Sequence, residues 1–400
     1  MSMSTTPFAL ICGDRSAFIN GPEPAEVRIP LSGHGQKAVK KKAQVHTGML
    51  VADHPGDKRG EAHSSICGVV AEVTPECVVI TAQKPAEPAE GEEPAKTQAD
   101  AIDLSSLEKD GLKAALKSLG IDLRVFLRRA ELLIINGLNP DPGIRWAEAL
   151  LENHKATLEK GLALLKVLSP AENIILAAHD AGISLAGAST RAVAPVYPNS
   201  VERLLAAAVT GSEQAKGVNV IGLHELYRLG CAAETGLPVT QTVMTVQDKN
   251  YLVKVGTTVQ ALLDHAGISV GEGDRVVLGG PLRGRSLSRL DIGIGKDDTA
   301  LFVVPAGTYP PVSDTACINC GECILRCPAR IRPNLLGRYS EFRMYDKCKD
   351  EYIDSCVECG LCSYWCVARR PVLQLIQLAK HQIVLQEQQV TACSLQGETK

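Results

Sequence analysis

The period of hydrophobic and polar positions changes several times along the chain, and each change marks a predicted module. Residues 20–82 hold short β-rich apolar runs separated by Gly and Pro, which is typical of an all-β barrel-like or sandwich-like module. Residues 84–100 are rich in Pro, Ala and Glu and cannot bury a core. We therefore predict an N-terminal β module over 1–83 and an acidic, Pro- and Ala-rich linker over 84–102.

From residue 103 to residue 238 the pattern alternates between strand and helix periods. Strands are predicted at the apolar runs 132–135, 173–178 and 217–222, the first two buried on both faces. Helices are predicted from their apolar spacing at 146–167, 200–209 and 224–236. Ser105-x-x-Glu108 predicts a capping box that begins a further helix. Such alternation is typical of a parallel sheet with crossover helices, so we expect a Rossmann-like α/β domain over 103–238.

Strand patterns return over 239–308, with one helix predicted at 259–265 and a turn at Lys249-Asn250. This mixture predicts a small α+β module. Residues 309–392 hold clustered cysteines and end in a predicted helix over 371–390, which has Pro371 in its first turn. The predicted fold class is therefore multidomain, with α/β and α+β parts.

Composition narrows the classes of function. The chain has 42 Lys and Arg against 45 Asp and Glu, a net charge of −3, and 4% aromatic residues. Nucleic-acid binding, which needs a basic face or stacking platforms, is not expected. The N-terminus lacks the pattern of a secretory signal and no stretch reaches 18 uninterrupted apolar residues, so we expect no direct membrane span. Clustered cysteine in such a chain indicates metal binding in a reducing compartment.

Two runs share the spacing C-x2-C-x2-C-x3-C, which is typical of ferredoxins with two [4Fe–4S] clusters. In this pattern the fourth cysteine of each run ligates the other cluster. We therefore assign cluster 1 to Cys317, Cys320, Cys323 and Cys366. Cluster 2 is assigned to Cys327, Cys356, Cys359 and Cys362. Structural zinc is the alternative, because C-x2-C pairs also bind it.

Several features around these runs complete the prediction. Gly321 and Gly360 stand at the same place in each run and let the backbone approach inorganic sulfur. Val367 replaces the proline that follows the first run, which removes no ligand. The insert between the runs has a partly helical pattern. We interpret six further cysteines as free buried or surface thiols, with no role proposed for them: Cys12, Cys67, Cys77, Cys231, Cys348 and Cys393.

Short motifs in a fixed order give the chain a family resemblance. These are VRIPL at 27–31 with Gly33 and His34, IING at 134–137, Tyr197-Pro198 with Glu202, NYLVKV at 250–255, GGP at 279–281, and the two cysteine runs. In this order they resemble the RnfC family, the C subunit of a membrane-associated, ion-translocating ferredoxin:NAD oxidoreductase. The resemblance implies a nucleotide site in the Rossmann-like domain and a β-grasp (SLBB) module over 239–308. It also implies a two-cluster, ferredoxin-like helical domain over 309–392.

The chain departs from this family where NADH-using members bind FMN and NADH. Those members carry a Gly-rich loop of the GLGGAGFPT kind before the strand that matches Ile134. The corresponding residues 118–129 of this chain contain a single glycine, Gly120. The acidic NGAECEP-like motif reads NGLNPDP here, with Asn139 and Asp141 at its acidic positions. We therefore expect a degenerate nucleotide site near Gly120, Asn136 and Asp141. FMN and NADH binding is expected to be lost or much weakened.

The function implied is an electron-transfer subunit of an Rnf-type complex that couples electron transfer to ion translocation. The chain itself is expected to relay electrons through its two clusters, with no catalytic acid, base or nucleophile. Expected partners are the membrane-embedded and flavoprotein subunits, and a donor or acceptor such as ferredoxin, NADH or a cytochrome. The expected location is peripheral, at the cytoplasmic face of the inner membrane. The alternatives are an RnfC-like flavin-dependent NADH dehydrogenase or cobalamin reductase, and a redox scaffold or sensor.

Overall fold

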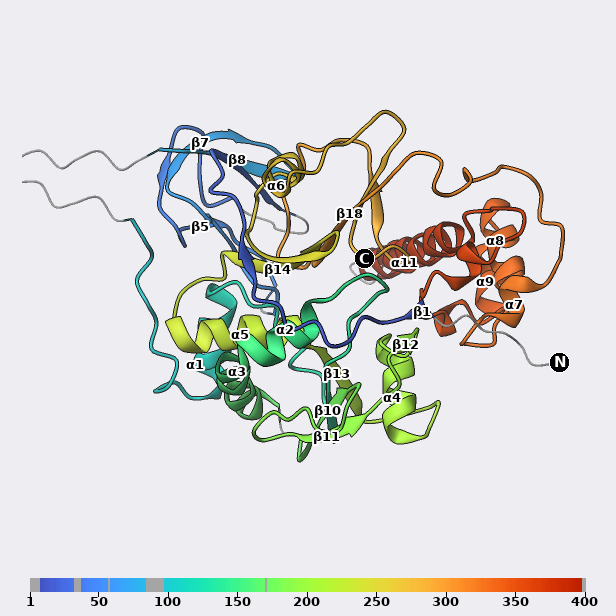
Figure 1. Ribbon diagram of the computed structural model, residues 1–400, viewed down its shortest axis with the longest axis horizontal. Helices are drawn as coiled ribbons and strands as arrows, with labels where there is room; N and C mark the ends of the chain where they lie inside the picture. Colours follow the sequence, from blue (N-terminus) through green and yellow to red (C-terminus); the bar gives the residue numbers. More distant parts are fainter. Residues whose placement is uncertain (1–7, 32–36, 57, 84–96, 170, 398–400) are drawn as a thin grey trace, which may run out of the picture. The chain divides into compact units, whose positions relative to one another are not determined.

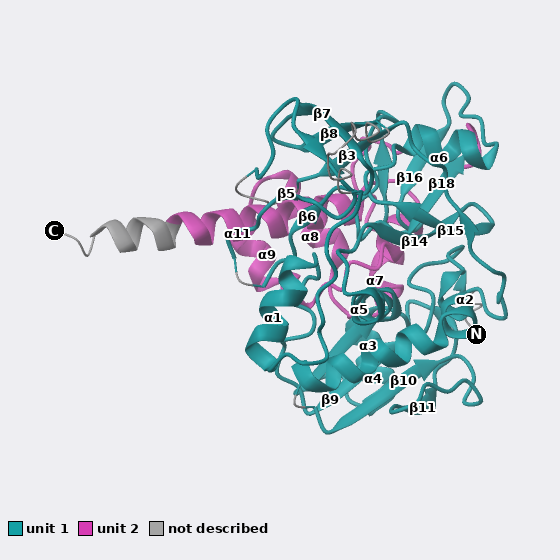
Figure 2. Cartoon of the chain, turned by 90° about the vertical axis from the view of Figure 1, so that its left-hand side faces the viewer, with its two compact units in different colours: residues 1–304 teal, residues 305–400 magenta. Residues whose placement is uncertain are grey.

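The computed structural model describes residues 8–31, 37–56, 58–83, 97–169 and 171–397, with the backbone alone for 390–397. The chain divides into two units, residues 1–304 and 305–400 (Figure 2). Gly33, His34 and residues 84–96 of the predicted linker lie outside the described residues. Among the described helices, none has the length and apolar character that a membrane span requires. The predicted division of the first unit into modules stays a prediction.

An antiparallel sheet of order β3-β8-β7-β4 makes up most of the β-rich N-terminal part (Figure 1). Its strands are β3 (Glu26–Pro30), β4 (Gln44–Val45), β7 (Gly68–Val73) and β8 (Cys77–Ala82). Beside it β5 (Leu50–Ala52) pairs with β6 (Ala62–His63). Alternate side chains such as Val27 and Ile29 are at most 1% exposed, which is the two-residue period of a sheet with one buried face.

The next sheet is fully parallel, as the sequence pattern predicts, and has the order β11-β10-β9-β13. Its strands are β9 (Leu132–Asn136), β10 (Asn173–Ala178), β11 (Ser189–Ala192) and β13 (Val218–Gly222). Leu133 and Ile135 pack in a core with α3 (Lys155–Leu168) and α5 (Leu223–Thr235), while α4 (Glu202–Thr210) also contacts β9. Ile134, between them, is also fully buried. Burial on both faces explains the continuous apolar run.

Helices α3 and α5 approach closely because glycines stand at their crossing. A Cβ atom on Gly230 would lie 2.0 Å from the Thr157 carbonyl oxygen. One on Gly111 of α1 (Lys109–Ser118) would meet only the Leu107 side chain, at 3.7 Å or more. We expect Gly230→Ala to lower the free energy of unfolding by about 1–3 kcal/mol, because the two backbones must separate. The matched change Gly111→Ala is expected to raise it by about 0.5–1 kcal/mol, since alanine favours helix.

Unfolding in denaturant, followed by circular dichroism, measures both changes. Effects of the same sign for the two alanine variants would contradict the packing argument, because helix propensity alone predicts stabilisation in both cases.

The last sheet of the first unit has the order β17-β16-β18-β14-β15-β2. Its strands are β2 (Ile19–Asn20), β14 (Gln241–Val246), β15 (Lys249–Lys254), β16 (Arg275–Leu278), β17 (Arg285–Leu287) and β18 (Ala300–Val304). Helix α6 (Val259–Ala266) packs on it, with Thr258 Oγ1 accepting from the Ala261 N–H at its start. The N-terminal segment thus reaches this sheet through β2, and β1 (Phe8–Ala9) pairs with β12 (Val196–Tyr197).

The second unit is helical. It contains α7 (Glu322–Leu325), α8 (Pro333–Glu341), α9 (Tyr345–Asp350), α10 (Leu361–Tyr364) and α11 (Val372–Gly397). The partly helical insert between the cysteine runs forms α8 and α9, and Cys348 of α9 is a fully buried free thiol. Helix α11 confirms the predicted closing helix and continues beyond it to Gly397. The prediction of a mixed α/β fold with several parts and several sheets is confirmed.

Three local predictions are wrong. Residues 146–167 form two helices, α2 (Trp146–Asn153) and α3, because His154 leaves the helical conformation (φ −127°) and its ring contacts Phe18 and Tyr227. The capping box is absent: Ser105 Oγ donates to Asp103 at 2.6 Å, and α1 begins only at Lys109.

The turn predicted at Lys249-Asn250 is also wrong. It lies at Gln247 and Asp248, where Gln247 has φ 52°, and both predicted turn residues belong to β15. Asn250 instead uses its side chain inside the fold, where its Oδ1 accepts from Thr245 Oγ1 at 2.9 Å.

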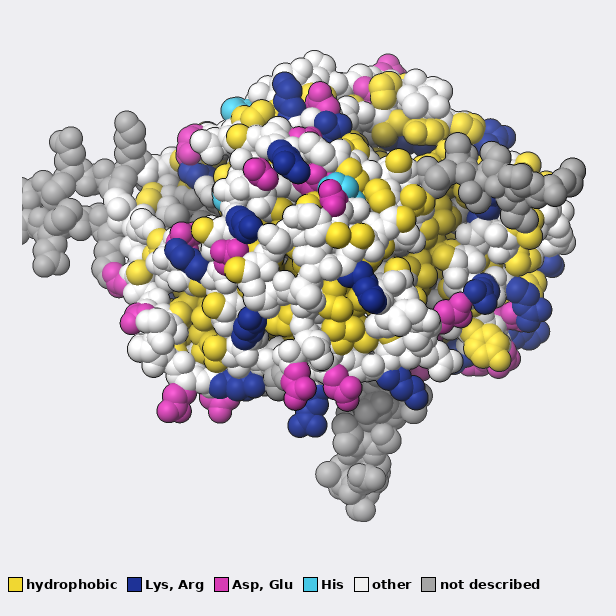
Figure 3. Space-filling view, turned by 60° about the horizontal axis from the view of Figure 1, so that its bottom comes forward, with side chains coloured by type: hydrophobic (Ala, Val, Ile, Leu, Met, Phe, Trp, Pro, Cys, Tyr) yellow, Lys and Arg dark blue, Asp and Glu magenta, His cyan; other side chains and the backbone are white. Residues whose placement is uncertain are grey.

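On the face drawn in Figure 3, the described Lys and Arg side chains alternate with Asp and Glu, and no large field of one sign appears among them. This agrees with the near balance of 42 basic and 45 acidic residues.

Candidate functional site

The two cysteine runs have the same backbone. Gly321 (φ 82°) and Gly360 (φ 79°) precede α7 and α10 in the left-handed region, which favours glycine. Two positions before each glycine, Asn319 and Glu358 also have positive φ, at 53° and 54°. Arg330 and Arg369, three positions after the fourth cysteine of each run, also have positive φ, at 54° in both cases. The shared spacing therefore corresponds to a duplicated local structure.

The eight cysteines of the two runs line two separate cavities in the second unit. Cys317, Cys320, Cys323 and Cys366 line the first cavity. Cys327, Cys356, Cys359 and Cys362 line the second. Each cavity therefore takes three cysteines from one run and the fourth from the other. None of the described cysteines is in a disulfide, so the eight thiols are available as ligands.

The two cavities differ in how deeply their cysteines are buried. Cys320 of the first is exposed, whereas Cys359 and Cys362 of the second are 7% and 8% exposed. Burial, together with neighbouring thiolate charge, raises the pKa of Cys323 and of Cys359 to about 11 each. Thiolates packed this closely need a cation, because burial and like charge both disfavour them. The donor set therefore fits a cationic metal group bound by deprotonated cysteine.

Side chains from both runs and from α11 hold the loops in place. The Arg326 guanidinium lies 4.4 Å from the centre of the Trp365 ring and so links the two runs. Lys380 of α11 donates to the Cys356 carbonyl at 2.8 Å. The N–H of Arg370 donates to Cys366 Sγ at 3.3 Å, and such bonds tune the potential of an iron–sulfur cluster.

In the region of the predicted nucleotide loop, most backbone N–H groups are already used inside the chain. Gly120 has φ 81°, and its carbonyl accepts from Lys296 Nζ at 3.0 Å. The N–H groups around it already have acceptors inside the chain: those of Leu119, Gly120, Ile121, Leu123, Arg124, Phe126 and Leu127. This stretch therefore presents few free backbone donors with which to cradle a phosphate.

The polar residues after β9 are also used within the fold. Asn136 Nδ2 donates to the Ser200 carbonyl at 2.8 Å, and its Oδ1 accepts from the Leu138 N–H. Asn139 binds the Ile11 carbonyl and the Ala147 N–H in the same way. Asp141 is 2% exposed, and its Oδ1 accepts from the Leu282 N–H at 3.1 Å. Burial raises the pKa of Asp141 to about 7, despite that bond and the nearby Arg283 charge.

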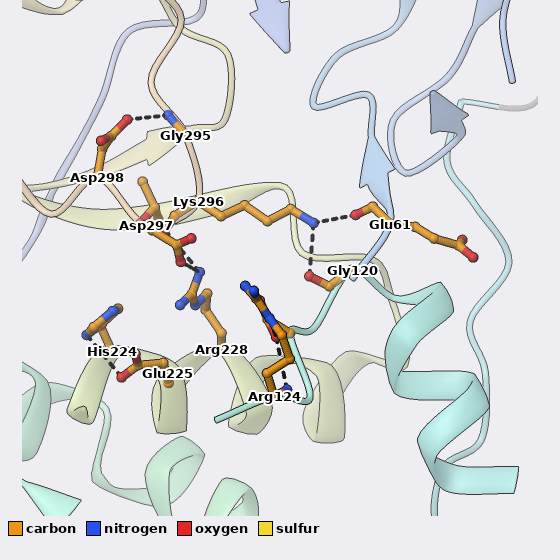
Figure 4. A network of polar contacts seen from close by, with 12 residues as sticks. Glu61, Gly120, Arg124, His224, Glu225, Arg228, Gly295, Lys296, Asp297 and Asp298 are labelled. Atoms are coloured by element: carbon orange, nitrogen blue, oxygen red, sulfur yellow. Dashed lines mark hydrogen bonds and ion pairs between the residues drawn. The ribbon is translucent and has the colours of Figure 1, made fainter. Parts of the chain in front are cut away.

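A cavity of about 910 Å³ lies beside Gly120, and neither Asn136 nor Asp141 lines it. Figure 4 shows its polar network, in which Arg228 Nη1 lies 2.7 Å from Asp297 Oδ1 and Lys296 Nζ donates to the Glu61 carbonyl at 2.8 Å. Burial, with the Arg228 charge, lowers the pKa of Lys296 to about 7. The structure thus separates Gly120 from the other two residues of the predicted nucleotide site.

Sequence reasoning missed two groups of polar residues. One is this network of Arg228, Lys296 and Asp297. The other is formed by Cys12, Glu148 and His179, whose ligand atoms lie within 4.8 Å of one another. No spacing rule could have found either group, because its members come from distant elements.

No protein-family model matches the chain. Over 83% of its length it is 26% identical to the C subunit of the proton-translocating ferredoxin:NAD(+) oxidoreductase complex of Clostridium ljungdahlii, and the match covers 82% of that protein. It is 25% identical, over 92% of its length, to the C subunit of the Na(+)-translocating ferredoxin:NAD(+) oxidoreductase complex of Acetobacterium woodii, covering 93% of that protein.

The C subunit of the ion-translocating oxidoreductase complex of Pectobacterium atrosepticum is 29% identical over 57% of this chain, which spans 36% of that longer protein. Among solved structures, an NAD+-reducing [NiFe]-hydrogenase matches 64% of this chain and 57% of its own, with 14% identity and a TM-score of 0.40.

Eight cysteines around two cavities fit iron–sulfur binding, so the site points to the class of iron–sulfur electron-transfer proteins. Over most of the chain, its curated homologues are the C subunits of ion-translocating oxidoreductase complexes, the RnfC proteins. The resemblance drawn from the motifs is confirmed.

Proposed function

We propose that this chain is the electron-transfer subunit of an Rnf-type complex and relays electrons through two [4Fe–4S] clusters. Cluster 1 is assigned to the cavity of Cys317, Cys320, Cys323 and Cys366, and cluster 2 to that of Cys327, Cys356, Cys359 and Cys362. The observation that carries the proposal is the crossed origin of the two cysteine sets, which is the arrangement of two-cluster ferredoxins.

The protein's part in this function is to bind, orient and shield the clusters. A bound [4Fe–4S] cluster accepts and releases single electrons, so the chain needs no acid, base or nucleophile. Cys320 is exposed, and Ile318 beside it is 62% exposed. The second set is more buried. We therefore assign electron exchange with a soluble partner to the cluster 1 side of the unit.

The proposal includes no flavin or NADH bound by this chain itself. Seven of the N–H groups between Leu119 and Leu127 already donate within the chain. Asn136 and Asn139 use both ends of their amides internally. We expect anaerobically purified protein to contain no stoichiometric FMN, and NADH to leave the clusters oxidised. Flavin fluorescence after denaturation measures the FMN content. Visible spectra before and after the addition of NADH show whether the clusters are reduced. Reduction by dithionite is the control, because it shows that the clusters accept electrons.

A stoichiometric flavin together with NADH-driven bleaching would favour the second candidate, a flavin-dependent NADH dehydrogenase or cobalamin reductase. The observation that favours this second candidate is the cavity of about 910 Å³ next to Gly120, which is large enough to hold a flavin. A chain whose reduced clusters pass no electrons to any other protein of the complex would instead favour the scaffold or sensor.

The partners of this function are the other subunits of the complex. The Clostridium relative is named for a ferredoxin:NAD(+) oxidoreductase. We propose membrane-embedded and flavoprotein subunits as neighbours, ferredoxin, NADH or a cytochrome as the distal redox partner, and a peripheral position on the cytoplasmic face. A tagged chain purified from gently solubilised membranes of its own host tests this. Co-elution of Rnf-type membrane subunits is expected, and their absence at equal recovery of the chain would contradict the proposal.

A further inference from the structure

Three side chains with metal-binding chemistry converge in the first unit, which holds none of the cluster cysteines. Cys12 lies in the N-terminal segment, Glu148 in the first turn of α2, and His179 directly after β10. One ligand atom of each lies within 4.8 Å of the other two. We propose that Cys12, Glu148 and His179 bind a zinc ion, with a fourth position open to water.

The distances are close to those that tetrahedral zinc needs. Bonds of about 2.0–2.1 Å to nitrogen and oxygen place two such ligands about 3.3 Å apart, and a thiolate about 3.5 Å from either. His179 Nδ1 and Glu148 Oε1 are 3.0 Å apart. The Cys12 sulfur lies within 4.8 Å of a ligand atom of each of these two residues.

The surroundings of Glu148 orient it as a ligand. The residue is 5% exposed, and its Oε2 accepts from the Gly13 N–H at 2.7 Å. This leaves Oε1 directed at His179. A ligating carboxylate whose second oxygen is held by a hydrogen bond is typical of protein metal sites. The arrangement also places a buried carboxylate where a cation would compensate its charge.

Cys12 is held near the other two residues by its own backbone. The Ile11 carbonyl accepts from Asn139 Nδ2 at 2.9 Å, and the Leu10 N–H donates to the Pro195 carbonyl at 2.9 Å. Gly13 follows with φ 79°, which permits the sharp turn toward α2. The thiol therefore stands beside Glu148 through a chain of specific contacts.

The ligand set favours zinc over a catalytic use of the thiol. One sulfur, one imidazole nitrogen and one carboxylate oxygen suit a borderline-soft divalent ion, and three protein ligands with an open position are common in zinc sites. Burial and the Glu148 carboxylate raise the pKa of Cys12, so the thiolate is disfavoured unless a cation is present. Zinc binding would release the thiol proton to solvent and tie the N-terminal segment to α2 and β10.

The test uses the full chain, with its clusters reconstituted anaerobically so that the cluster cysteines are occupied. Zinc is titrated against a chromophoric chelator, and its ligands are read from zinc X-ray absorption. We expect one zinc per chain, with one sulfur and otherwise nitrogen and oxygen neighbours. Cys12→Ser and His179→Gln are each expected to weaken binding more than the roughly 10–100-fold that loss of an outer-shell partner costs.

Cys77→Ser is the matched control, because it removes a partly buried thiol elsewhere in the first unit. It should bind zinc as the wild type does. Equal iron content and circular dichroism in all variants show that folding is intact. The proposal is overturned if the wild type binds no zinc, if both ligand variants keep wild-type affinity, or if the zinc has four sulfur neighbours, which would place it at cluster cysteines.

Discussion

The double variant Cys317→Ala/Cys366→Ala is expected to keep one intact [4Fe–4S] cluster, whereas Cys317→Ala/Cys327→Ala is expected to keep none. Both variants remove two cysteines. The first removes two ligands of the same cavity, although they come from different runs. The second removes one ligand from each cavity, although both come from the same run. Alanine is chosen because its side chain offers no replacement ligand.

Mössbauer spectra of reconstituted protein, with electron paramagnetic resonance after reduction, count the intact clusters. Wild type should contain two, or about eight irons per chain. Cys348→Ala is the control, because this buried thiol of the same core lines neither cavity, and it should keep both clusters. If the two double variants exchange their outcomes, each run holds its own cluster. Two zinc ions with four sulfur neighbours, and no iron, would support the zinc alternative.

Asp141→Asn is expected to change how the stability of the first unit depends on pH. The folded-state pKa of Asp141 is raised to about 7 because the carboxyl is 2% exposed, against an unfolded value of about 3.9. Because the folded pKa is raised, Asp141 favours the folded state only in its neutral form. Its contribution to the free energy of unfolding is therefore fully present below the unfolded pKa and is lost as pH rises toward 7. Above the folded pKa of about 7, the loss in the free energy of unfolding no longer changes with pH.

Between pH 5 and pH 8, wild type should therefore lose about 2–3 kcal/mol relative to Asp141→Asn, which cannot ionise. The asparagine keeps an oxygen that can accept from the Leu282 N–H. Unfolding of both proteins at the two pH values measures the difference. Asp248→Asn removes an exposed carboxylate in the β14–β15 turn and should follow the wild type. A pH-independent difference between wild type and Asp141→Asn would show that Asp141 is not held in a neutral form.

Much of the fold can be read from local patterns. The continuous apolar run at 132–135 and its neighbours predict parallel strands because both faces of this sheet are buried. The errors come where tertiary contacts override periodicity. Leucines at helical spacing continue across His154, but the ring of that residue packs between Phe18 and Tyr227 and the helix breaks. Asn250 has the composition of a turn residue, yet its amide binds Thr245 inside the sheet.

The candidate site divides in the same way. The absence of a Gly-rich loop is visible in the sequence, and the structure adds that seven of the N–H groups between Leu119 and Leu127 already have acceptors within the chain. The charged network beside Gly120 was not predicted, because Arg228 and Lys296 are 68 positions apart and meet only through packing of α5 against the loop before β18.

By itself, the sequence determined the ligand types, the two cysteine runs and the order of strands and helices. These depend on spacing within a few residues, where a glycine in the left-handed region followed by a short helix sets the positions of neighbouring thiols. Only the tertiary structure decided which elements meet. It buried Asp141 against the Leu282 backbone and placed Cys12 beside Glu148 and His179. Such juxtapositions result from packing many side chains together, and no local pattern records them.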